Sequence, residues 1–395
     1  PTTFCSMISK ALVGLSLLWI ASVASAEEVA RLVYIGVEED PYYAPQPVYT
    51  GLSLKDRKRP IEGIHVAMRG TRVLGRALGL KFELVEVMLD EEAAAGPAIA
   101  EAWQKGALAV VLDLPAKTMS AALDEISKST GVHFNIRHKG ADWRGRDCQA
   151  NLLHTIPSHA MEADALAQHL RAKGWSRVLL LSGQTAEDRE RVAVVHASAA
   201  KFGLKIVDER VFELSNDPRS RSQNNVSLLT GVVRHDVIWL VDVEGEFGRY
   251  IPYATNHARP VVGSEGLRPL AWHWTWERHG APQLNQRFRR RQDRDMSSED
   301  WSAWIAVRAV IQAVQRVGKA DASAVGDYLL SEEFRLDLYK GVPGSFRSWN
   351  GQLRQPLLLA THNAVIQRAP IEGFEHKTDT LDTLGLDLPE NTCKL

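Results

Sequence analysis

Short apolar segments alternate with longer segments of helical periodicity along most of this chain. The pattern begins at 31–37, where Arg31 is followed by the unbroken apolar run Leu-Val-Tyr-Ile-Gly-Val. Such runs are typical of parallel strands buried on both faces, and parallel neighbours need crossover connections that are usually helices. The chain is therefore predicted to fold as an α/β protein.

The alternation occurs in two series, which predicts two Rossmann-like lobes with parallel-sheet cores. The expected strands of the first series are 31–37, 81–87, 107–112 and 132–136, with helices at 60–78, 91–105 and 117–130. Those of the second are 177–182, 205–212 and 236–241, with helices at 160–173 and 186–202. Later segments include a strand-like stretch at 270–276, a helix at about 300–317 and a hairpin turn at Asn350-Gly351.

These late segments could rejoin either sheet, which predicts hinge crossovers between the lobes. We expect the first lobe over 27–148, with part of 256–340 returning to it. The second lobe is expected over 149–255, with about 341–368 returning to it. Residues 369–395 are expected to form a C-terminal tail.

Residues 1–26 have the pattern of a signal peptide. Lys10 is their only charge, an apolar run covers 11–23, and Ala24-Ser25-Ala26 suits a cleavage site. The run is too short to span a bilayer, although a retained anchor or a buried helix is the alternative interpretation. We expect a periplasmic protein that is not inserted in the membrane after cleavage, and a monomer.

The charge balance argues against nucleic acid as a partner. Of 47 basic and 48 acidic residues, the leader holds only Lys10, so the mature chain has 46 basic residues and a net charge of −2. A chain with this net charge has no general electrostatic attraction for polyanions such as nucleic acids.

The mature chain has two cysteines, Cys148 and Cys393, and the expected compartment is oxidising. A disulfide between them is one interpretation and two free thiols the other, because sequence does not reveal the distance between their Cα atoms.

Three enzyme signatures are absent. The chain has no Gly-x-Ser-x-Gly, no His-Glu-x-x-His and no phosphate-loop Gly-Lys-Ser/Thr, and its first strand ends in Gly36-Val-Glu-Glu39 without a glycine-rich dinucleotide motif. We expect a protein that is not an enzyme and has no resident cofactor.

The order of elements resembles that of type I periplasmic solute-binding proteins of the leucine/isoleucine/valine-binding group. The resemblance spans about 31–368 and includes Gly263-Ser-Glu-Gly266 and the closing segments Gly341–Phe346 and Trp349-Asn350-Gly351. The string at 49–60 and Ala271-Trp-His-Trp-Thr-Trp-Glu277 resemble a branch associated with pyrroloquinoline-quinone (PQQ)-dependent alcohol dehydrogenase systems. The resemblance implies the binding component of an ABC transporter, with permease and ATPase subunits as partners.

In such folds, loops after the strands of both lobes face a shared cleft. The candidate ligand-binding residues are accordingly Glu39, Tyr42, Asp113, Thr118, Arg137, Asp142, Trp143, Asp242, Glu244 and Glu265. Glu265 matches by position the acid that holds a ligand ammonium in the amino-acid binders. The turn at 113–118 does not match their carboxylate-binding turn, because Asp113 and Pro115 stand where small hydroxyl residues would donate.

Acids gather in the loop after the first strand and again at Asp242, Glu244 and Glu246. Oxygen ligands of this kind suit hard cations, which predicts a metal site at these last three residues. The other interpretation is that they are solvated or paired with neighbouring arginines.

Trp272, Trp274 and Trp276 would share one face of a strand, either as core packing or as a stacking wall for a quinone-like solute. The expected function is solute binding by hinge closure, linked to PQQ-dependent alcohol oxidation, with a metal ion or PQQ-like ligand as open possibilities. The alternative is a lanthanide-binding or accessory protein of a quinoprotein dehydrogenase without a transport role.

Overall fold

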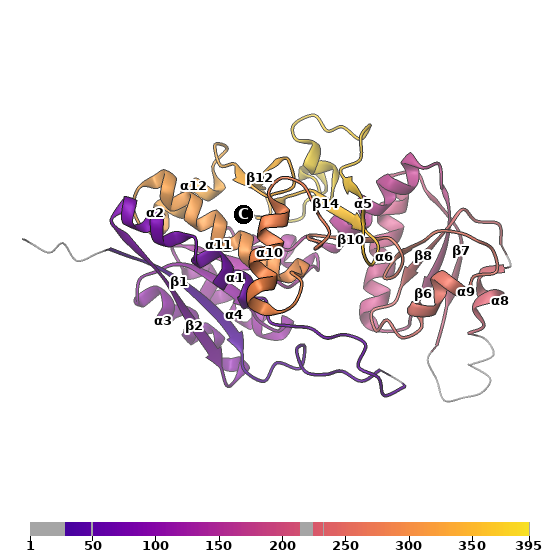
Figure 1. Cartoon of the computed structure of the whole chain (residues 1–395), viewed down its shortest axis with the longest axis horizontal. Coiled ribbons are helices and arrows are strands. Elements are labelled where there is room, and N and C mark those ends of the chain that lie inside the picture. The colour runs from indigo at the N-terminus through magenta and orange to yellow at the C-terminus, as the bar shows by residue number, and fades with distance from the viewer. Residues whose placement is uncertain (1–27, 49, 214–223, 232, 395) are drawn as a thin grey trace, which may run out of the picture.

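The computed structural model describes residues 28–48, 50–213, 224–231 and 233–394. The chain forms two α/β lobes that lie next to each other, with the late antiparallel strands and the C-terminal segment between them (Figure 1). The predicted fold class is confirmed. The expected signal peptide lies outside the described residues. Within those residues, no helix combines the length and the apolar character needed to cross a membrane.

The first lobe is built on a parallel sheet of order β2-β1-β3-β4-β5. Its strands are β1 (Glu28–Val37), β2 (Leu80–Leu89), β3 (Ala107–Asp113), β4 (Val132–Asn135) and β5 (Leu152–His154). Its helices are α1 (Ile61–Met68), α2 (Thr71–Leu78), α3 (Ala95–Gln104), α4 (Ala116–Lys128), α10 (Ala281–Gln292), α11 (Ser298–Val317) and α12 (Ala322–Leu330).

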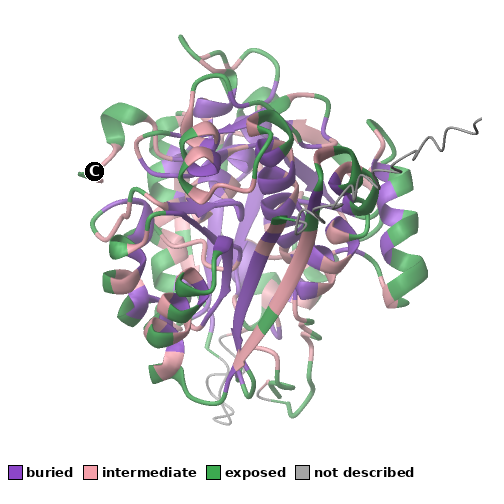
Figure 2. Ribbon diagram, turned by 90° about the vertical axis from the view of Figure 1, so that its left-hand side faces the viewer, coloured by how far each residue is buried: buried purple, intermediate pink, exposed green. Residues whose placement is uncertain are grey.

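Strand β1 shows why its sequence lacks polar alternation. Leu32 and Tyr34 pack on the sheet face covered by α1 and α11, whereas Val33 and Ile35 pack on the opposite face, against α3 and α4. Both faces of the strand are therefore buried, as the buried strands between helix layers in Figure 2 show.

The second lobe contains a parallel sheet of order β7-β6-β8-β9. Its strands are β6 (Arg177–Ser182), β7 (Lys205–Val211), β8 (Val237–Val241) and β9 (Val261–Gly263), and its helices are α5 (His159–Ala172), α6 (Ala186–Lys201), α8 (Val226–Gly231) and α9 (Ile251–Ala254). A small antiparallel sheet of β10 (Arg268–Leu270), β14 (Leu357–Ala360) and β15 (Val365–Ala369) packs against α5.

The late chain divides between the lobes. Helices α10, α11 and α12 join the core of the first lobe. The segment 341–368, expected with the second lobe, splits: β12 (Pro343–Phe346) and β13 (Leu353–Arg354) pair beside β11 (Leu336–Asp337) and add Phe346 and Leu353 to the first lobe's core. Strands β14 and β15 add Leu357 and Leu359 to the core of the second lobe.

Buried amides tie the connections between the lobes together. The Gln355 side chain donates to the Thr155 carbonyl oxygen at 2.7 Å, and the Gln352 amide donates to the carbonyls of His154 and Ile156 at 3.1 and 3.2 Å. These bonds join segments that are about 200 residues apart in sequence. The connection at 154–156 and the connection at 352–355 therefore run side by side between the lobes.

Two expected elements differ from the structure. The helix expected at 60–78 is broken at Arg69-Gly70 into α1 and α2. Residues 271–276 do not continue β10 as a strand, because the chain turns where the Trp276 N–H donates to the His273 carbonyl. Consequently the three tryptophans do not share a face: Trp272 is buried against Trp301, Trp276 is half-buried and Trp274 is 37% exposed.

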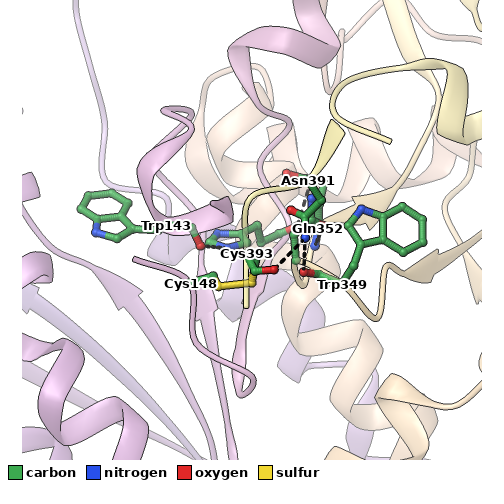
Figure 3. The surroundings of a disulfide bond; sticks show 8 residues. Trp143, Cys148, Trp349, Gln352, Asn391 and Cys393 are labelled. Atoms are coloured by element: carbon green, nitrogen blue, oxygen red, sulfur yellow. Dashed lines mark hydrogen bonds between the residues drawn. A yellow bond between two sulfur atoms is a disulfide. The ribbon is translucent and has the colours of Figure 1, made fainter. Parts of the chain in front are cut away.

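Cys148 and Cys393 form a disulfide, with their Cα atoms 5.7 Å apart. The C-terminal tail reaches it from the second lobe, whose core includes Leu384, and ends beside the first lobe. Close to the disulfide, the Asn391 side chain donates to the carbonyl oxygens of Trp349 and Cys393 (Figure 3). The tail therefore crosses from one lobe to the other.

Candidate functional site

A cavity of about 540 Å³ lies where the carboxyl ends of the two parallel sheets face each other. The first lobe contributes the β1–α1 connection (38–60) and the loop after β4, and the second lobe contributes α5, α6 and the loops after β8 and β9. The charged or ionisable side chains that line the cavity are Lys55, Asp56, Arg57, Lys139, His159, Glu162, Arg191, Asp242, Glu244, Arg249, Glu265 and Arg268.

Two polar contacts bridge the lobes around this cavity. The backbone N–H of Thr50 donates to the carboxylate of Glu246, 3.2 and 3.3 Å from its two oxygens. The Lys139 ammonium pairs with Glu162 at 2.6 Å. Burial alone would raise the pKa of Glu162, but Lys139 and His159 hold it down at about 2, so this acid stays charged. The lobes are therefore in direct contact through both of these pairs.

The first lobe's own strand ends are occupied by a buried ionic network. The Asp113 carboxylate at the end of β3 accepts hydrogen bonds from Tyr34 at 2.5 Å and Tyr43 at 2.7 Å. The Arg137 guanidinium lies 2.5 Å from Asp40 and 3.6 Å from Asp113. Burial raises the pKa of Asp113, which Arg137 and the two tyrosines oppose.

This network shows what the sequence-predicted residues of the first lobe do. Arg137 pairs with both Asp113 and Asp40. The Tyr42 ring lies 4.1 Å from the Arg137 guanidinium carbon. Thr118 and Trp143 are buried, whereas Glu39 and Asp142 are exposed. None of these seven candidates lines the cavity between the lobes.

The second-lobe candidates are placed differently. Asp242, Glu244 and Glu265 do line the cavity. The Asp242 oxygens, however, accept the backbone N–H groups of Gly245 at 2.8 Å and Gly248 at 2.6 Å, so this acid organises its own loop. Burial raises the pKa of Asp242, and those two N–H groups oppose the shift.

The hypothesis of a metal site at Asp242, Glu244 and Glu246 gains no support. Asp242 and Glu246 each hold backbone N–H groups, and within the described ranges no three His, Cys, Asp or Glu side chains converge as metal ligands. Asp242 and Glu246 are near neighbours in sequence but hold different backbone N–H groups in space.

The residues missed by sequence reasoning are the cations of the cavity wall: Lys55, Arg57, Lys139, Arg191, Arg249 and Arg268. One signal was present, because Lys139 directly follows Arg137-His138 in the loop after β4. For Lys55 there was none, since its position depends on how the long β1–α1 connection crosses to the second lobe.

No protein-family model matches the chain, and no curated protein is similar to it in sequence. Solved structures do match. An amino-acid ABC transporter substrate-binding protein from Pseudomonas fluorescens has a TM-score of 0.67 and 14% identity, over 94% of this chain and 100% of that one.

Two further matches are a branched-chain amino acid ABC transporter periplasmic ligand-binding protein and a benzoate complex. The first, from Burkholderia xenovorans, has a TM-score of 0.66 and 15% identity, covering 86% of this chain and 95% of that one. The second is a Rhodopseudomonas palustris solute-binding protein with a TM-score of 0.62 and 11% identity, covering 93% and 100%. At these identities the similarity establishes the fold, which is that of the two-lobed periplasmic binding proteins.

Proposed function

We propose that this protein is the periplasmic solute-binding component of an ABC transport system. The observation that carries the proposal is the cavity between the lobes, whose wall includes loops that follow strands of both sheets. A solute that contacts both walls favours the closed arrangement, because it gains interactions that the open arrangement lacks. The matched solved structures, several of them ABC transporter binding proteins, support the assignment.

In this proposal the chain makes and breaks no bond in its solute and works with permease and ATPase subunits. The link to PQQ-dependent alcohol oxidation rests on the resemblance of 49–60 and 271–277. One matched structure from Rhodopseudomonas palustris contains 3,4-dihydroxybenzoic acid, and another contains benzoate. Acids are products of alcohol oxidation, so such solutes are compatible with that link.

One observation favours the accessory role as the second candidate. At the strand ends of the first lobe, Asp113, Arg137, Tyr34 and Tyr43 are engaged with one another. A protein that docks on a dehydrogenase and moves no solute would not need these side chains for a ligand. The cavity lined by Lys55 and Arg191 favours solute binding.

Thermal unfolding of the purified mature protein tests the two candidates. The panel contains amino acids, short and aromatic alcohols, the corresponding acids, PQQ, and calcium and lanthanide ions. A solute at 100 times its dissociation constant stabilises a protein by about 2.7 kcal/mol, and we expect at least one small organic solute to do so here. No shift with any solute, together with co-purification with a dehydrogenase, would favour the accessory role.

A further inference from the structure

Six lysine and arginine side chains from both lobes line the cavity together with five acids, and most of these acids are already engaged elsewhere in the protein. Lys55 and Arg57 come from the β1–α1 connection, Arg191 comes from α6, and Arg249 follows β8. Through the described ranges, neither Lys55 nor Arg249 has a carboxylate within ion-pair distance. Arg191 pairs with Glu187 at 2.5 Å through one end of its guanidinium, while its buried Nε has no hydrogen-bond partner.

Most acids of the cavity wall already have partners. Asp56 pairs with Lys58 at 2.7 Å and Glu162 with Lys139 at 2.6 Å, while Asp242 accepts its two backbone N–H groups. Glu244 and Glu265 remain without an ion pair within the described part of the chain, and both belong to the second lobe. Within the described ranges, Lys55 and Arg249 therefore face the cavity without a paired carboxylate, whereas Arg191 has Glu187 on one end of its guanidinium.

Lys55 experiences this imbalance directly. Burial and the positive charges of Arg57 and Arg191 together lower its pKa to about 8, and the carboxylates of Asp242 and Glu187 oppose only part of that shift. Like charges that are held together in a partly buried site repel one another unless an anion lies between them. The missing partner is thus an anion that enters the cavity.

Apolar side chains form another part of the wall. Leu54, Leu166, Val194, Leu240 and Leu270 all line the cavity. Apolar side chains next to charged groups suit a ligand with an apolar body and one charged end. Glu244 and Glu265 would repel a second negative charge, which favours a monoanion over phosphate or a dicarboxylate.

We infer that the cavity binds a small monocarboxylate with an apolar body, and that Lys55 and Arg191 hold its carboxylate from opposite lobes. This inference rests on the proposed function and specifies its solute. The carboxylate position differs from the edge of the first sheet, where Asp113 and Arg137 already pair. A carboxylate bridging the β1–α1 connection and α6 would link closure of the lobes to recognition of the acid.

Isothermal titration calorimetry of the full mature chain tests the inference with four probes: benzoate, isovalerate, benzyl alcohol and inorganic phosphate. We expect at least one of the two carboxylates to bind, and neither the neutral alcohol nor phosphate to do so. Lys55→Gln and Arg191→Gln should each weaken carboxylate binding about 10- to 100-fold, the usual effect of losing a charge-assisted hydrogen bond.

The control is Lys117→Gln, which removes an exposed lysine of α4 outside the cavity and should leave the affinity unchanged. Far-UV circular dichroism and thermal unfolding establish that each variant is folded, and Lys55→Arg should restore most of the binding. The inference is overturned if neither carboxylate binds, or if both glutamine variants bind like the wild type. If only a neutral solute binds, the solute-binding function stands and the carboxylate inference fails.

Discussion

At the scale of single residues, partners in space decide the role of each charge. Asp113 and Asp242 were attractive as ligand donors because of their positions at strand ends, yet each one is buried and holds a group of the protein itself. Buried charges need partners, and an acid at a strand end satisfies that need with whichever cation or N–H group reaches it. Lys55 is the opposite case, a half-buried cation without an ion pair in the described part of the chain.

The pKa of Lys55 gives a prediction for pH. An anion binds the protonated form, and loss of that proton as pH rises through about 8 removes the attraction. Affinity for a carboxylate should therefore be highest below pH 8 and fall roughly tenfold per unit well above it, since ordinary arginine and carboxylate pKa values lie outside this range. Titration calorimetry from pH 7 to 9.5 measures the effect.

Lys55→Arg is the matched control, because a guanidinium stays charged over the whole range and the affinity should be nearly constant. If the affinity of the wild type for a carboxylate does not change with pH, Lys55 does not take part in binding the anion.

At the scale of elements, the β1–α1 connection is the segment on which the site depends. Tyr43 and Arg59 fix it to the first lobe, and Thr50 reaches Glu246 in the second. Between these anchors it carries Lys55 into the cavity. Residues 54–57 of this connection, which looks like a loop in the sequence, thus form part of the wall of the site.

Removing the cation that holds this connection should be costly. Arg137→Met leaves Asp40 and Asp113 buried without their cation; their side chains are only 2% and 0% exposed. We expect the free energy of unfolding of the first lobe to fall by about 3–5 kcal/mol, which urea titration measures. Arg146→Met removes an exposed arginine paired with Asp147 and should cost less than about 1 kcal/mol. Equal losses in the two variants would show that the buried network adds no stability.

At the scale of the whole molecule, the lobes are joined by several crossovers and by the C-terminal tail. The Cys148–Cys393 disulfide closes a sequence separation of 245 residues and fixes the tail beside the first lobe. The side-chain amides of Gln352 and Gln355 bond to the backbone at His154 and Thr155, and so hold two connections between the lobes together. The region between the lobes is therefore held by hydrogen bonds, and the tail is tied to the first lobe by a covalent bond.

Opening the disulfide should destabilise the molecule. We expect the double variant Cys148→Ser/Cys393→Ser to lose about 2–5 kcal/mol of unfolding free energy, because the unlinked unfolded chain gains conformational freedom. Chemical denaturation measures the loss. Reducing agent should destabilise the wild type by a similar amount and leave the double variant unchanged. If reducing agent destabilised both proteins, the loss of stability would have a cause other than this disulfide.

Local patterns were sufficient for most of the fold. The apolar runs at 31–37 and 177–182 predicted β1 and β6. A strand between two helix layers is buried on both faces, so nearly all of its consecutive residues are apolar. The helix break at Arg69-Gly70 and the turn at 271–276 were missed; at the turn, Asn285 of α10 accepts from the Trp272 indole and donates to the Trp274 carbonyl oxygen, a partner that the local sequence does not reveal.

What the sequence determined by itself was two series of buried strands and covering helices, and hence two lobes with facing strand ends. Only the tertiary structure decided which charges face the cavity. Tyr43 meets Asp113 across 70 positions and Thr50 meets Glu246 across 196, and nothing local distinguishes these acids from Glu265, which lines the cavity. The physical reason is that burial and pairing of a charge depend on the neighbours that the folded chain brings within a few ångströms, which need not be neighbours in sequence.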